Sequence, residues 1–193
     1  MAETSNALIL THGAGSNADS PLLVAVESSL AGADLQVERY TLPFRKLRAH
    51  GPPFAGDAAR DREGLRQAVL AMRSRVAGRV FLGGHSYGGR QATILASEEP
   101  DLADGLVLLS YPLHPPRRPA ELRTAHFSNL TTPALFLHGA RDPFGSLEEM
   151  SAALVLIPAR AELIAVEGAG HDLKSKHAIE VIAAGFRRFF GTS

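Results

Sequence analysis

The sequence lacks cysteine, shows no excess of either charge and contains no long uninterrupted hydrophobic run. Without cysteine the chain forms no disulfide and no thiolate metal site, which is typical of a cytoplasmic protein. Its 20 basic side chains balance 20 acidic ones, which argues against a nucleic acid or an anionic membrane as a partner. The polar residues 1–6 and the short apolar run after them predict neither a signal peptide nor a membrane-spanning segment.

What remains is an ordinary globular composition, 45% hydrophobic and 21% charged over 193 residues. No repeat, low-complexity segment or linker divides the chain, so we expect a single domain spanning residues 1–193. Short apolar strands alternate with helical segments, which predicts an α/β three-layer sandwich around a six-stranded, mostly parallel, doubly wound sheet. The expected strands are 7–10, 35–42, 79–82, 106–109, 134–137 and 163–166, and the expected helices are 22–30, 57–76, 90–99, 146–156 and 178–190.

The most informative stretch follows the third expected strand. Residues 84–88 read G-x-S-x-G between an apolar run and a helical segment, the context in which a tight turn exposes a nucleophilic serine. Positions 84 and 88 must be small where strand and helix pass close together, and both are glycine. We interpret Ser86 as a nucleophile; the alternative is an ordinary glycine-rich loop between a strand and a helix.

Two further polar residues follow the carboxyl ends of strands, where functional groups gather in parallel sheets. Asp142 comes after the fifth strand and His171 after the sixth, in the chain order Ser, Asp, His that accompanies this type of turn. His171 is the predicted base, and Asp142 the acid that orients it and stabilises its positive charge. Glu167 and Asp172 are the rivals for the acid, because both lie close to His171 in sequence.

Acyl transfer also needs two N–H donors aimed at the developing oxyanion. We expect them from the backbone of Tyr87 and of Ala14, the latter in the loop after the first strand. These two loops meet if the first and third strands are neighbours. The residues expected to contact substrate are Gly13, Gly15, His85, Tyr111 and His114; residues 44–56 are interpreted as a loop of unclear role.

Other chemistries find less support in the sequence. Residues 13–18 fit the dinucleotide-binding pattern G-x-G-x-x-A, but Ser20 and Pro21 predict that the helix begins too late for it. Residues 83–88 lack the Lys and Ser or Thr that complete a phosphate-binding loop, and no H-E-x-x-H metal motif occurs. We therefore expect no metal and no organic cofactor.

Four strings carry a resemblance to a known family: residues 11–15, 83–90, 111–116 and 139–145. With them the chain resembles the α/β-hydrolase superfamily, and within it small hydrolases related to dienelactone hydrolase. The resemblance implies a minimal α/β-hydrolase fold without a large lid, and it carries the nucleophile, acid and base onto Ser86, Asp142 and His171. It implies a serine esterase or thioesterase that cleaves a small-molecule ester or thioester through an acyl-enzyme. The alternative is a non-catalytic scaffold protein that keeps the fold; the sequence predicts no oligomeric state.

Overall fold

A six-stranded parallel sheet forms the centre of the molecule. The computed structural model describes residues 6–32 and 34–191. In this part of the chain the strand order is β2-β1-β3-β4-β5-β6, and every neighbouring pair is parallel. The strands are β1 (Asn6–Thr11), β2 (Leu35–Tyr40), β3 (Val80–His85), β4 (Gly105–Leu109), β5 (Ala134–Gly139) and β6 (Ala161–Val166). The predicted α/β class and six strands are confirmed.

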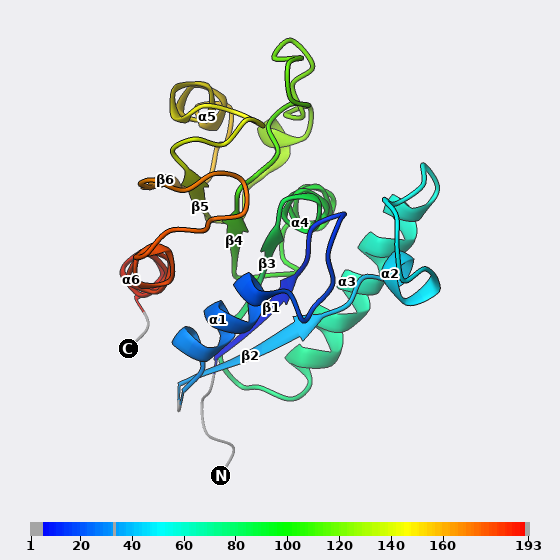
Figure 1. Ribbon diagram of the computed structural model, residues 1–193. Helices are drawn as coiled ribbons and strands as arrows, with labels where there is room; N and C mark the ends of the chain where they lie inside the picture. The colour runs from blue at the N-terminus through cyan, green and yellow to red at the C-terminus, as the bar shows by residue number, and fades with distance from the viewer. Residues whose placement is uncertain (1–5, 33, 192–193) are drawn as a thin grey trace.

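Helices cover both faces of this sheet (Figure 1). They are α1 (Pro21–Leu30), α2 (Pro43–Leu47), α3 (Asp57–Arg73), α4 (Tyr87–Glu98), α5 (Leu147–Leu154) and α6 (Ala178–Phe190), with a short 3-10 turn, η1 (Phe127–Asn129). Buried side chains of α1 and α6 pack on one face, and those of α3, α4 and α5 pack on the other. The predicted three-layer sandwich is therefore confirmed.

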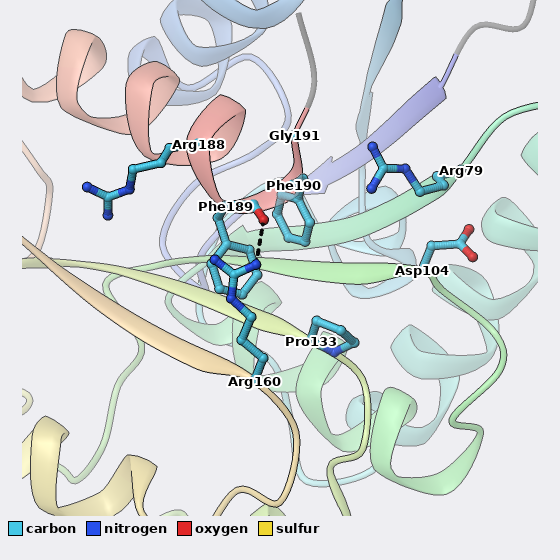
Figure 2. A pocket seen from close by; sticks show the side chains of 8 residues that line it. All are labelled: Arg79, Asp104, Pro133, Arg160, Arg188, Phe189, Phe190 and Gly191. Carbon is cyan, nitrogen blue, oxygen red and sulfur yellow. Dashed lines mark hydrogen bonds between the residues drawn. The ribbon is translucent and has the colours of Figure 1, made fainter.

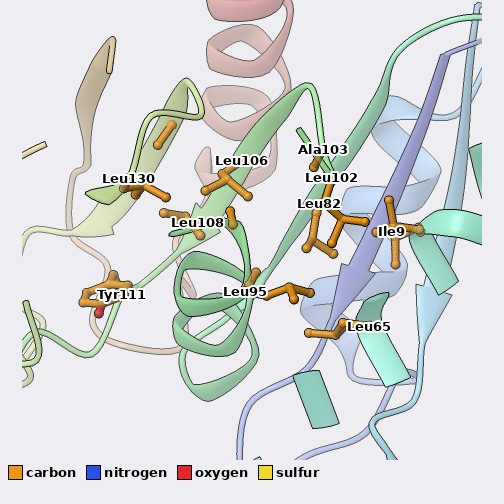
Figure 3. Close-up of a cluster of buried hydrophobic side chains, with 14 of the residues drawn as sticks. Ile9, Leu65, Leu82, Leu95, Leu102, Ala103, Leu106, Leu108, Tyr111 and Leu130 are labelled. Atoms are coloured by element: carbon orange, nitrogen blue, oxygen red, sulfur yellow. The ribbon is translucent and has the colours of Figure 1, made fainter. Parts of the chain in front are cut away.

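The central strands consist of apolar residues because both of their faces are covered. Along β1, Leu8 and Leu10 join the core beneath α1 and α6, whereas Ile9 joins the opposite core. This alternation follows from the two-residue period of a strand. Figure 3 shows the second core, in which Ile9 and Leu82 lie near Leu65 of α3.

One expectation about the helices is wrong. Helix α2 begins at Pro43, because proline is well suited to the first turn of a helix. The predicted loop 44–56 thus starts as a helix. In α3 the buried residues include Leu65, Val69 and Met72, whereas Leu70 is 43% exposed.

The strand order fixes where loops converge. Since β1 lies between β2 and β3, the winding direction reverses there, and the loops that follow β1 and β3 meet at the carboxyl edge of the sheet. The connection from β4 to β5 carries only η1, so the described residues contain no large lid. No helix in residues 6–32 or 34–191 combines the length and apolar character needed to cross a bilayer.

Candidate active site

Ser86 occupies a strained turn between β3 and α4. Its φ of 52° and ψ of −115° lie in a region that L residues rarely adopt. The turn is held on both sides: the Ser86 N–H donates to the carbonyl oxygen of Leu109 at 2.9 Å, and its own carbonyl accepts from the N–H of Arg90 at 3.0 Å. The side chain of Ser86 is therefore presented at the end of β3, as a nucleophile turn requires.

Two glycines allow this turn to pack against the loop after β1. A Cβ atom on Gly84 would lie 2.8 Å from the carbonyl oxygen of Thr11, and one on Gly88 would lie 2.6 Å from that of His12. Both separations are too short for a real Cβ atom, so any side chain would push α4 away from β1. The prediction that positions 84 and 88 must be small is confirmed.

Ser86, His171 and Asp142 form a continuous hydrogen-bonded chain. The Nε2 atom of His171 lies 2.8 Å from Ser86 Oγ, and its Nδ1 atom lies 2.8 Å from Asp142 Oδ2. Because a carboxylate only accepts, Nδ1 carries the proton and donates to Asp142. Nε2 then has a free lone pair that accepts a hydrogen bond from the hydroxyl of Ser86. An imidazole in this state can act as a base.

Three residues fix the position of His171. The carboxylate of Asp142 is fully buried, and its second oxygen accepts from the N–H of Phe144 at 2.8 Å. The ring of Phe144 lies over the imidazole with centroids 4.2 Å apart. His85 holds the backbone of His171, because its Nε2 donates to the carbonyl oxygen of His171 at 2.7 Å. Phe144 was not expected at the site, although it lies in one of the strings that carry the family resemblance.

The loop after β1 lies against this turn. A Cβ atom on Gly13 would come within 3.1 Å of His85 Nδ1 and 3.4 Å of Ser86 Cβ, so glycine permits the close approach. The neighbouring N–H of Ala14 and the N–H of Tyr87, at the start of α4, have no acceptor among the described residues. Both N–H groups are therefore available to a ligand, whereas Gly15 is exposed and a Cβ atom on it would have nothing within 4 Å.

His12 and Arg45 hold the carbonyl groups of that loop. The Nε2 atom of His12 accepts from the N–H of Leu42 at 3.1 Å, so its Nδ1 donates to the carbonyl oxygen of Gly13 at 2.9 Å. In a planar trans peptide the next N–H points the opposite way, which turns the N–H of Ala14 away from His12. The guanidinium of the buried Arg45 donates to the carbonyl oxygen of Ala14 at 2.6 Å.

A buried carboxylate contacts Tyr87, the residue that follows Ser86 in the turn. Asp61 of α3 accepts from the hydroxyl of Tyr87 at 2.8 Å and from the N–H of Phe44 at 2.9 Å. Burial raises the pKa of both Asp61 and the Tyr87 hydroxyl above their ordinary values, and the hydrogen bond contributes for Tyr87. Sequence reasoning missed this contact because it joins three segments that are far apart in the chain.

Two of the residues expected to contact substrate are buried. Tyr111 is only 1% exposed, and its hydroxyl donates to the carbonyl oxygen of Arg123 at 2.6 Å within the core. His114 is 5% exposed and lies 2.8 Å from the carbonyl oxygen of Pro115 and 3.4 Å from Glu149. Both side chains point into the packing beneath their loop, because its apolar residues are drawn into the core.

The alternatives to this site lose support. Glu167 is exposed and Asp172 pairs with Lys174 at 2.9 Å, so Asp142 is the carboxylate that contacts His171. Helix α1 begins at Pro21, which leaves residue 18 outside it, contrary to the dinucleotide-binding pattern. Within the described ranges no group of three or more His, Asp or Glu side chains is arranged so that it could hold a metal ion.

A separate hollow of about 440 Å³ lies at the opposite edge of the sheet (Figure 2). Its lining includes the residues directly before β3, β4 and β6, namely Arg79, Asp104 and Arg160. These are the amino ends of the strands, so this hollow is not part of the Ser86 site.

The sequence matches the model of a family described as an alpha/beta hydrolase domain over residues 4–184. The chain belongs to the α/β-hydrolase family. Among solved structures it is similar to a dienelactone hydrolase from Anabaena variabilis, with a TM-score of 0.77, 20% identity, and coverage of 97% of this chain and 86% of that chain. It is also similar to Est1E from Butyrivibrio proteoclasticus, with a TM-score of 0.76, 18% identity, and coverage of 98% and 90%. At these identities the likenesses show the α/β-hydrolase fold.

Proposed function

We propose that the chain is a serine hydrolase that cleaves a small carboxylic ester or thioester through an acyl-enzyme. The observation that carries the proposal is the chain of 2.8 Å hydrogen bonds from Asp142 through His171 to Ser86, with Ser86 in a strained turn. In this arrangement a serine hydroxyl has a base within reach and the base has an orienting acid.

The first half-reaction forms the acyl-enzyme. Ser86 Oγ attacks the carbonyl carbon of the substrate while His171 Nε2 takes the hydroxyl proton. The oxyanion accepts hydrogen bonds from the N–H groups of Tyr87 and Ala14, and the buried Asp142 stabilises the imidazolium. His171 then gives its proton to the departing alcohol or thiol, which leaves the acyl group on Ser86.

The second half-reaction releases the acid. His171 takes a proton from a water molecule, whose oxygen attacks the acyl carbon, and the proton returns to Ser86 Oγ as the ester bond breaks. Phe144 and His85 keep the imidazole in one orientation through both halves, since they hold its ring and its backbone.

Similar proteins support a small carboxylic substrate. One of the similar structures is a dienelactone hydrolase, and another is Est1E with ferulic acid bound. The absence of a large lid in the described residues leaves the carboxyl edge of the sheet open, which suits a small ester.

Hydrolysis of 4-nitrophenyl acetate and of phenyl thioacetate tests the proposal. We expect turnover by the wild-type chain and its loss in Ser86→Ala, with an acetyl group recovered on Ser86 after an acid quench. Ser97→Ala, which removes a hydroxyl from the same α4 helix away from the site, should behave as wild type. Equal turnover by Ser86→Ala would contradict the proposal, and a non-catalytic scaffold would turn over neither substrate.

A further inference from the structure

A cavity of about 420 Å³ lies on the α1 and α6 side of the molecule. It is bounded by the start of α1, the start of α6 and the segment that follows His171. The residues that line it are Ser16, Ser20, Pro21, Leu22, Ala25, His85, Asp172, Leu173, Lys174, Ser175, Ala178 and Ile179. Its size falls at the lower end of the range of about 300–1,000 Å³ that is usual for small-molecule sites.

This cavity adjoins the Ser86 site. His85 immediately precedes Ser86, and Asp172 immediately follows His171. The imidazole of His85 belongs to both places: it lines the cavity, its centroid lies 5.2 Å from that of His171, and it donates to the carbonyl oxygen of His171. His85 therefore lies between Ser86 and the cavity, and it is past His85 that a substrate bound at Ser86 would reach the cavity.

The walls of the cavity are suited to hydrocarbon. Side chains from α1 and α6, among them Leu22, Ala25 and Ile179, present apolar groups. The two charged side chains, Asp172 and Lys174, are 54% and 82% exposed and pair with each other at 2.9 Å, so their charges are directed to solvent. A hydrocarbon placed against these apolar side chains would gain burial.

We propose that this cavity binds a hydrocarbon chain or ring carried by the ester substrate. The inference rests on the proposed hydrolase function and adds a substrate class to it: esters with an apolar group larger than methyl. That group can belong to the acyl part or to the alcohol part, and two homologous series of substrates distinguish these sources.

The first test measures kcat/KM along both series, 4-nitrophenyl esters from acetate to octanoate and alkyl acetates from methyl to octyl. We expect a rise of about fourfold per methylene along one series while the chain still fits, from about 0.8 kcal/mol per buried methylene. Ala25→Trp fills the cavity and should abolish the rise while hydrolysis of 4-nitrophenyl acetate persists. Ile179→Ala enlarges the cavity and should move the optimum to a longer chain.

Val24→Trp is the matched control, because Val24 is the neighbour of Ala25 in α1, is 38% exposed and does not line the cavity. It should keep the chain-length dependence of the wild type. A flat profile in both wild-type series, or a rise that survives in Ala25→Trp, would overturn the proposal.

The second test does not need catalysis. Titration of the Ser86→Ala chain with 1-hexanol should shift the NMR methyl signals of Ala25 and Ala178, and Ala25→Trp should suppress the shift at Ala178. No shift would overturn the proposed cavity occupant. If no ester is turned over but these signals shift, the proposed hydrolase function fails while the hydrocarbon-binding cavity stands.

Discussion

Arg45 donates from its guanidinium to the carbonyl oxygen of Ala14 at 2.6 Å, and to that of Ser16 at 2.9 Å. Arg45 is 8% exposed and forms no ion pair among the described residues. The N–H groups of Arg45 donate to backbone carbonyl oxygens. Arg45 of α2 therefore holds the loop after β1, which carries the proposed oxyanion donor Ala14. A segment interpreted from the sequence as a loop of unclear role thus has a position directly relevant to the site.

Replacing Arg45 by methionine should loosen that loop and lower kcat for ester hydrolysis by about 10- to 100-fold, less than the 10²- to 10³-fold typical of deleting an oxyanion donor. KM should change little, because the interaction is needed mainly in the transition state. Lys46→Met, next to it on the exposed side of α2, is the control and should keep the wild-type kcat. Equal losses of kcat in both variants would contradict this role of Arg45.

Asp142→Asn should lower kcat by about 10⁴-fold while the fold is kept, since an amide no longer selects the Nδ1–H tautomer of His171. The measurement is steady-state kinetics with circular dichroism as a check of folding. Glu167→Gln removes a carboxylate that is nearby in sequence but exposed, and it should leave kcat unchanged. A loss limited to a few-fold in Asp142→Asn would exclude it as the orienting acid.

Gly88→Ala should destabilise the protein by about 1–3 kcal/mol, because its Cβ would press on the backbone of the loop after β1. Urea unfolding measures this loss. Gly56→Ala is the comparison: a Cβ there has nothing within 4 Å, and its φ of −81° suits alanine. If the two variants lose the same stability, the close approach of α4 to β1 is not the reason for glycine at position 88.

Stability should fall as the pH is lowered from about 7 towards 4, because several histidines are buried in neutral form. Burial lowers the pKa of His12, His85 and His138, and, with a contribution from Arg90, lowers that of His126 to about 4. A histidine of the unfolded chain has a pKa of about 6.5, so below that pH the unfolded chain binds more protons than the folded chain. Acid therefore favours unfolding.

His126→Gln tests this sign. The glutamine can still bond to Thr93 but takes up no proton, so the free energy of unfolding should decline less steeply between pH 6.5 and 4 than in wild type. Urea titrations at four pH values give the slope, and His50→Gln, at an exposed position, should leave it unchanged. A steeper decline in His126→Gln would contradict the direction of the pKa shift.

The meeting of Ser86, Asp142 and His171 follows from simple features of the sequence. Each of the three residues lies in the turn or loop that follows a short apolar strand, and parallel strands bring their carboxyl ends to one edge. The catalytic roles of these residues stay predictions until activity is measured. Their proximity, however, needed only the positions of the strands.

Other parts of the site could not be read from local pattern. A place in a loop at the right edge does not say which way a side chain points, so Tyr111 and His114 were expected at the site although both are buried beneath it. Helix α2 has five residues, too few for a hydrophobic period to be visible. The contact of Arg45 with Ala14 joins residues 31 positions apart, and no spacing rule predicts such a contact.

Intact-mass spectrometry after treatment with a small fluorophosphonate tests the central claim most directly, since the reagent marks only a serine activated by a neighbouring base. We expect one covalent adduct on the wild-type chain and on Ser97→Ala, and none on Ser86→Ala. Failure of a folded wild-type chain to react, or an adduct that persists on Ser86→Ala, would contradict the assignment of Ser86 as an activated nucleophile.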